Sequence, residues 1–314
     1  SMGAYRYGRP HVGFQALMSN ALLQRQNALG YVTELLSGDF NSPFGRSSHH
    51  QVWSEAMTVT PILRGLLGVE AADFASTVRF APQLPADWDS VEVRCVAVGS
   101  ATLDLSLVRG AGQMSIRLRP RVAAAASSPG NSTHDPSSRG ASGAGTSGAN
   151  GPGASSPGSA ADVLTVILAP AFPLDARVRS VKADGHSLSY EVRREGDVQR
   201  VEFRVEARRE TEVRISYDEG SDVYLPFEPP APGARSESLR VLRSHAEAGA
   251  LRLLLEGVAG HTYRLNVKTQ RMPEGWSDFD ATRVAPDVFQ IRVSFENTTT
   301  GYVRREVVIP LRKR

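Results

Sequence analysis

The spacing of hydrophobic residues divides the chain into two zones. Up to about residue 72, apolar side chains recur at intervals of three and four residues, which is the period of an amphipathic helix. In the first stretch these positions are Phe14, Leu17, Met18, Ala21, Leu22, Ala28 and Leu29. Gly30 follows them and is predicted to end this helix as a C′ glycine.

A second helix is predicted after a polar loop that runs from Ser37 to Ser47. Ser48 is a residue type that caps helices, and we expect Pro61 to bend the helix and Gly68 to end it. Its apolar positions are Val52, Ala56, Val59, Leu63, Leu66 and Leu67. Two helices joined by a long loop form an αα-hairpin, which is too small to be a domain.

From Thr77 onward the apolar period is two, as in strands with one buried face. Examples are the runs Leu103 to Leu107, Met114 to Leu118 and Val198 to Val205. Glycine and aspartate turns separate these runs, so we expect antiparallel β-sandwich material. The run Glu228 to Gly233 is rich in proline and predicts a boundary. The expected fold is therefore mixed and mainly β: a helical hairpin over residues 1–72, a β-sandwich over 73–219, and a smaller β-domain over 220–314.

The segment from Ala123 to Ala161 contains no Val, Ile, Leu or aromatic residue. It cannot bury a core, so we expect disorder. The strand-like runs on either side indicate an expanded hairpin loop within one sandwich and not a domain boundary.

Charge and cysteine content exclude several classes. The net charge is +3 with a pI near 9.2, and arginines alternate with apolar residues, as in Arg200 to Val205. This is typical of a solvated sheet face, so no nucleic-acid partner is expected. The chain contains no run of 18 apolar residues, so no membrane span is predicted. Cys95 is the single cysteine, which excludes an internal disulfide, and its strand-like surroundings predict a small core residue.

The compartment is open. The opening Ser1-Met2-Gly3 resembles a tag remnant before an interior segment, so a signal peptide would lie upstream. Many bacterial periplasmic proteins have no disulfides, and a periplasmic or secreted location is slightly favoured over the cytoplasm.

Common cofactor and catalytic signatures are missing. No glycine-rich phosphate loop follows a strand, and there is no Gly-x-Ser-x-Gly elbow. His49 and His50 are adjacent, and adjacent residues of a helix point about 100° apart, which makes a poor metal pair. We expect neither a cofactor nor a metal.

Candidate chemistry lies between residues 30 and 56. Glu34 follows the predicted helix end, and a polar and aromatic helix start with Gln51 and Trp53 comes soon after it. Sugar sites need carboxyls to handle water and protons, and aromatic faces and amides to hold the ring.

At these residues the chain resembles the six-hairpin (α/α)6-barrel glycosidases, above all the bacterial glycogen-debranching or amylo-α-1,6-glucosidase-like proteins. The resemblance is carried by Gly30 to Glu34, by Gln51-Val52-Trp53-Ser54 and by Phe80 to Trp88, and it covers roughly residues 5 to 120. It implies that the chain contains the last hairpin of a barrel whose N-terminal part is missing.

The resemblance also implies a reaction and its residues. Hydrolysis of a glycosidic bond, usually with inversion, needs a general base and a general acid. Glu34 takes the position of the base, and Gln51, Trp53 and His50 take positions of substrate contacts. The acid comes from an earlier barrel loop, so this chain by itself is expected to be inactive.

Each residue has an alternative reading. Glu34 could be a solvated loop acid, Trp53 a core residue, Gln51 a partner of its own helix terminus, and His50 a capping or packing residue. Asp39 and Glu55 are nearby carboxylates for which solvation or helix-end electrostatics suffices. The alternative function is a non-catalytic carbohydrate-binding or protein-interaction β-sandwich.

The composition of residues 123–161 leads to a first prediction. Deleting them and joining the flanking strands with a short turn should leave the melting temperature nearly unchanged, because nothing in the segment can offset the entropy of ordering it. Thermal unfolding followed by circular dichroism measures this. A large drop in melting temperature would show that the segment is structural.

Overall fold

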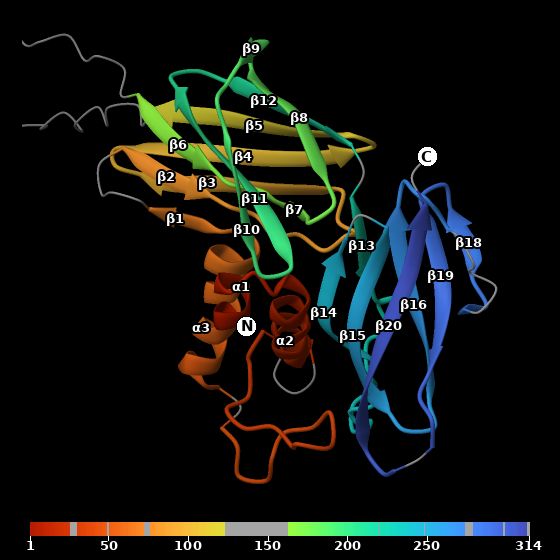
Figure 1. Cartoon of the computed structure of the whole chain (residues 1–314). Coiled ribbons are helices and arrows are strands. Elements are labelled where there is room, and N and C mark those ends of the chain that lie inside the picture. The colour runs from red at the N-terminus through yellow and green to blue at the C-terminus, as the bar shows by residue number, and fades with distance from the viewer. Residues whose placement is uncertain are drawn as a thin grey trace, which may run out of the picture.

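The computed structural model describes residues 1–25, 30–48, 50–71, 76–122, 163–218, 220–247, 249–273, 279–297 and 299–312. Within these residues the protein is mainly β, with two β-sandwiches and a group of helices beside them (Figure 1). The mainly β class and the antiparallel sheets expected from the period of two are confirmed.

The first sandwich consists of two sheets that face each other across one core. In one sheet the order is β1-β2-β6-β11-β10, with β7 also pairing with β11; in the other it is β3-β4-β5-β12-β8-β9. The first sheet contains β1 (Val69–Ala71), β2 (Thr77–Phe80), β6 (Leu164–Leu168), β7 (Ala171–Pro173), β10 (Glu191–Glu195) and β11 (Val198–Ala207). The second contains β3 (Ser90–Val98), β4 (Ala101–Gly110), β5 (Gln113–Val122), β8 (Arg177–Ala183), β9 (His186–Ser187) and β12 (Thr211–Asp218).

Alternating side chains of these strands fill the core, as the period of two requires. In β4 the core members are Ala101, Leu103, Leu105 and Leu107, and across the sandwich β6 contributes Leu164, Val166 and Leu168. Strands β2 and β6 pair in parallel, whereas the other paired strands of this sandwich are antiparallel.

The second sandwich is smaller and has a core of its own. Its sheets follow the orders β13-β16-β19-β18 and β14-β15-β20-β17. The strands are β13 (Ser221–Tyr224), β14 (Arg240–Ala246), β15 (Ala250–Val258), β16 (Thr262–Thr269), β17 (Met272–Pro273), β18 (Thr282–Ala285), β19 (Val288–Ser294) and β20 (Tyr302–Arg312). Leu251, Leu253 and Leu255 of β15 face Leu265, Val267 and Ile291 in its core.

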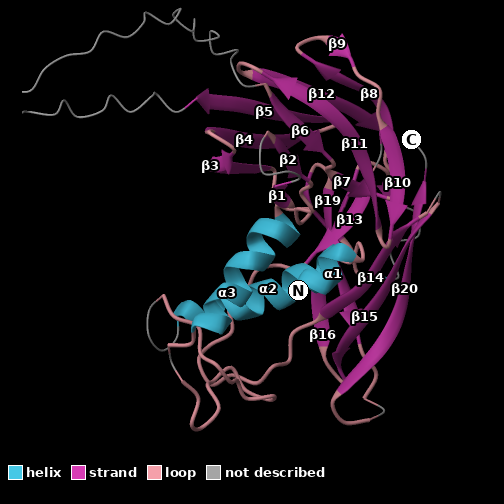
Figure 2. Cartoon of the chain, turned by 90° about the vertical axis from the view of Figure 1, so that its left-hand side faces the viewer, coloured by secondary structure: helices cyan, strands magenta, loops and turns pink. Residues whose placement is uncertain are grey.

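The helices lie beneath the first sandwich and beside β14 (Figure 1), on one side of the strands (Figure 2). They are α1 (Met2–Arg6), α2 (Pro10–Leu22), the 3₁₀ turn η1 (Leu23–Arg25), α3 (Val52–Thr60) and η2 (Pro61–Leu66). Tyr5, Leu17 and Leu66 form the small core between them.

The second helix differs from its predicted form at two residues. It begins after Gln51 and not at Ser48, because the Ser48 carbonyl accepts hydrogen bonds from Glu34 N and Thr33 Oγ1 across the loop. Pro61 lacks the N–H that an α-helix needs, so the α-helix ends before it and the chain continues as a π-helical segment from Pro61 to Leu66. Gly68, at φ +61°, ends the helix as predicted.

Two further expectations are corrected. Residues 123–161 lie outside the described residues, but β5 and β6 on either side belong to opposite sheets, so the segment does not join a hairpin. A replacement must therefore span the roughly 10 Å between packed sheets. Cys95 is exposed and not a core residue, because β3 bulges between Val93 and Val96 and turns its side chain out.

The helices meet the first sandwich at a close backbone contact. Gly8, between α1 and α2, lies against the turn of Glu195 and Gly196 between β10 and β11, where Asp197 N donates to Gly8 O at 2.8 Å. Both glycines have positive φ, and a Cβ on Gly8 would lie 1.9 Å from Glu195 O.

A buried polar cluster extends this contact to the second sandwich. The carboxylate of Asp197, 2% exposed, accepts from Arg9 Nη1 with both oxygens at 3.1 Å and from Arg243 Nε of β14 at 2.9 Å. Beside it, His11 Nε2 lies 2.9 Å from Asp222 Oδ1, which also accepts from Ser244 Oγ at 3.2 Å.

The charges of this cluster support one another. Burial disfavours the imidazolium of His11, but the Asp222 charge and its hydrogen bond outweigh burial and raise the pKa of His11. Burial likewise opposes ionisation of Asp222, but His11 holds the pKa of Asp222 below its usual value. The pair stabilises the fold fully between the ordinary pKa of aspartate and that of histidine, and this stabilisation is lost as the pH rises through the raised pKa of His11 or falls through the lowered pKa of Asp222.

The contact at Gly8 leads to a second prediction. Gly8→Ala should destabilise the protein by the left-handed strain of about 1–2 kcal/mol and by a further 1–3 kcal/mol or so for the collision with Glu195 O. Gly185→Ala is the matched control, since Gly185 has φ +86° and no atom within 4 Å of the added Cβ. Urea unfolding should give a larger loss for Gly8→Ala, and equal losses would contradict this reading.

Candidate functional site

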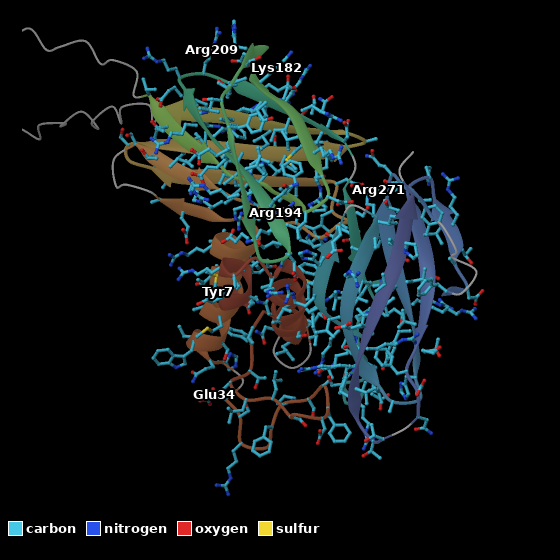
Figure 3. All side chains as sticks on the ribbon, viewed as in Figure 1. Tyr7, Glu34, Lys182, Arg194, Arg209 and Arg271 are labelled. Atoms are coloured by element: carbon cyan, nitrogen blue, oxygen red, sulfur yellow. The ribbon has the colours of Figure 1, made fainter. Side chains whose placement is uncertain are left out.

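The loop from residue 30 to 48 is closed on itself by side chains of its two ends. Thr33 Oγ1 lies 2.6 Å from Ser47 Oγ, and both residues are buried. Ser47 Oγ accepts from Leu35 N at 2.8 Å, while Glu34 N donates to Ser48 O at 2.9 Å. The backbone of Glu34 is thereby fixed, and its side chain is exposed on the loop (Figure 3).

The tip of the same loop is held by the proline-rich segment that precedes β14. Asn41 N donates to Ala234 O at 2.7 Å, and Gly233 N donates to Asn41 O at 2.9 Å. Asn41 Nδ2 also donates to the carbonyls of Pro230 and Ala231. No local sequence pattern predicts this pairing, because the proline-rich composition of the segment indicates a domain boundary.

Phe40 adds a contact to the same junction. It forms an isolated antiparallel bridge with Arg235, whose guanidinium lies 5.7 Å from the ring centroid. This is a cation–π distance, so the loop tip has both backbone and side-chain support.

Three of the predicted residues, His50, Gln51 and Trp53, lie at the start of α3. Gln51 is the N-cap residue of the helix but makes no side-chain capping hydrogen bond. His50 is exposed and packs edge-on against Tyr31, with ring centroids 4.1 Å apart. His49 lies outside the described residues. The hydrogen bond from Glu34 N to Ser48 O joins the backbone of Glu34 to the segment just before these three residues.

Trp53 is not a core residue, because 72% of it is exposed. The neighbouring carboxylates have other surroundings. Glu55 lies in the first turn of α3, where a negative charge is favoured by the helix dipole. Asp39 is exposed, and its carbonyl accepts from Ser236 N at 2.9 Å.

Apolar side chains are exposed along the helix that follows. We call this set the exposed helical face: Val52 (74%), Trp53 (72%), Met57 (65%), Val59 (52%) and Leu63 (41%). Monomeric soluble proteins rarely leave large apolar patches open, and such patches mark interaction sites. Val52, Val59 and Leu63 belong to the apolar stripe predicted for this helix, and no described residue covers them.

The described residues contain no group of His, Cys, Asp or Glu side chains able to hold a metal ion. None of the described helices is long and apolar enough to cross a membrane. Comparisons with models of protein families, with curated proteins and with solved structures found no match to this chain.

The exposed helical face leads to a third prediction. The protein should bind an apolar fluorescent dye and self-associate at micromolar concentration, and Trp53→Arg with Met57→Glu should reduce both effects. Because both positions are exposed, the free energy of unfolding should change by less than about 0.5 kcal/mol for each.

The control is Val192→Arg with Val308→Glu, two exposed positions on strands β10 and β20. Dye fluorescence and light scattering should not respond to this control. Equal responses to both double variants would show that the helical face is not special.

Proposed function

We propose that this chain is the C-terminal part of a glycoside hydrolase that supplies the general base, Glu34, to an active site completed by helices of an (α/α)6 barrel. The observation that carries the proposal is the position of Glu34. Its exposed side chain stands on a loop whose backbone is hydrogen-bonded to Ser48, just before His50, Gln51 and Trp53 in the chain, and the helix that follows has an exposed apolar face.

The exposed helical face supports the proposal that further helices complete a barrel. Helices of a barrel pack against neighbours through apolar stripes, and α3 has such a stripe without a partner in the described part of the chain. Further helices of the same protein that packed on Val52, Met57 and Val59 would cover it. Their loops would then lie at the N-terminal end of α3, where Glu34 is.

The proposed chemistry is inverting hydrolysis. Glu34, ionised, holds a water molecule and takes its proton as the water attacks the anomeric carbon. A second carboxyl from the added barrel protonates the leaving oxygen, and room for the water requires the two carboxyls to be about 6.5–9.5 Å apart.

Three neighbours are suited to hold the sugar. The side-chain amide of Gln51 makes no capping hydrogen bond to the helix, so it can donate to and accept from sugar hydroxyls. Trp53 offers an apolar face with one N–H donor, and the His50 ring is oriented by its packing on Tyr31. These contacts would place the anomeric carbon near Glu34.

The fourth prediction tests the base. In the protein that carries the complete barrel, Glu34→Gln should lower kcat by at least about 10²-fold, the usual scale of general-base catalysis. KM should change little, because the amide keeps the size of the side chain and removes a transition-state role. Steady-state hydrolysis of the best glycoside measures both constants.

Asp39→Asn is the matched control, since Asp39 lies on the same loop and is held through its backbone carbonyl, which accepts a hydrogen bond from Ser236 N. It should leave kcat unchanged. A normal kcat for Glu34→Gln would end the assignment of the base and favour a non-catalytic carbohydrate-binding or protein-interaction role.

A further inference from the structure

A cavity of about 250 Å³ lies where the two sandwiches meet, away from every residue of the proposed active site. One wall comes from the loop before β3, the β4–β5 turn and β7 of the first sandwich. The other comes from β13, β16 and the β18–β19 turn of the second sandwich. The volume is just below the roughly 300–1,000 Å³ typical of pockets for drug-sized molecules, so a smaller ligand fits.

Arg109 contributes a donor that is only partly used. Its Nε donates to Trp88 O at 3.0 Å and its Nη2 to the carbonyls of Pro85 and Trp88. No carboxylate of the described residues forms an ion pair with it, and Nη1 has no hydrogen-bond partner there. Burial lowers the pKa of Arg109, but a guanidinium keeps its charge at neutral pH.

The acceptors of the cavity are also incompletely used. Oδ1 of Asp222 accepts from His11, Ser244 and Val223 N, whereas its Oδ2 has no partner within the described residues. The Asp287 carboxylate at the β18–β19 turn has none there either. Lys268 of β16 is satisfied by Ala86 O and by Asp89, at 3.1 and 2.8 Å.

One side of the cavity is aromatic and apolar. The rings of Phe172 and Tyr217 meet edge to face, with centroids 5.1 Å apart, and Met114 lies beside them. The Tyr217 hydroxyl donates to Gly110 O at 3.3 Å, which fixes the ring.

These features together select a neutral ligand. An anion would meet Asp222 and Asp287, and a cation would meet Arg109, so either charge would face a buried like charge at a cost. A neutral molecule with several hydroxyls can accept from the guanidinium and donate to the carboxylates, which are charge-assisted hydrogen bonds. It can also lay an apolar face on the aromatic side.

We propose that this cavity binds one neutral sugar residue, with its hydroxyls between Arg109 and the carboxylates of Asp222 and Asp287. The site joins the two sandwiches, so an occupant contacts both. The proposal is independent of the proposed hydrolysis, because no residue of that site lines the cavity.

Ligand-observed NMR tests the proposal with this chain. The probes are free neutral hexoses and pentoses, their methyl glycosides, the corresponding disaccharides, and inorganic phosphate as the charged comparison. At least one neutral sugar should bind saturably with a Kd of about 1–10 mM, as suits a ligand of this size. Phosphate should neither bind in the cavity nor compete.

Two variants locate the binding. Ala111, exposed on the β4–β5 turn, lines the cavity, so Ala111→Phe should weaken sugar binding at least tenfold. Asp287→Asn should also weaken it by removing an acceptor. Ala231→Phe, an exposed alanine that does not line the cavity, is the control, and melting temperatures should match for all three.

Comparison of the different sugar probes and variants distinguishes the possible results. If methyl glycosides and disaccharides bind as well as free sugars, the site takes a residue of a chain; if they fail, it takes the free sugar; both results support the proposal. Absence of saturable sugar binding, competition by phosphate, or binding unchanged by Ala111→Phe would overturn it. Binding lost in Trp53→Ser but kept in Ala111→Phe belongs to the proposed active site and overturns the cavity proposal alone.

Discussion

The carboxylate of Asp197 is the point on which the arrangement of this protein depends. It stands in the turn before β11 and receives Arg9 from the helices and Arg243 from the second sandwich. A buried charge without partners is costly, so separating either unit from the others would leave Asp197 poorly compensated. His11 and Asp222 repeat the arrangement one step further into the second sandwich.

This junction determines the positions of both proposed sites. It orients α2 against β14 and so sets where the uncovered face of α3 points. It also closes one end of the cavity between the sandwiches, since Asp222 belongs to the cluster and to the cavity wall. Glu34 lies on the far side of the helices, so an active site and a sugar-binding cavity could act without sharing a residue.

The local sequence pattern predicted the strands and helices, which depend mainly on neighbouring residues. The period of two predicted the strands, and the helical spacing predicted the helix that α3 and η2 form together, with its end at Gly68. The strand pattern predicted the wrong burial for Cys95, because a bulge in β3 exposes this residue. The contacts of Arg9 with Asp197, 188 residues apart, have no local signature, and neither do the walls of the cavity. The sequence left Glu34 as either a solvated loop acid or a base, and its exposure and that of Trp53 both depend on which neighbours are present.

The pairing of the Glu34 loop with the segment around residue 234 also has a consequence for biosynthesis. Asn41 bonds to the carbonyls of Pro230 and Ala231, which lie 189 and 190 residues later in the chain. At a synthesis rate of about 5–20 residues per second, these partners leave the ribosome roughly 10–40 s after the loop does. The loop that presents Glu34 therefore waits until the chain has been made as far as Ala231 before its tip is fastened.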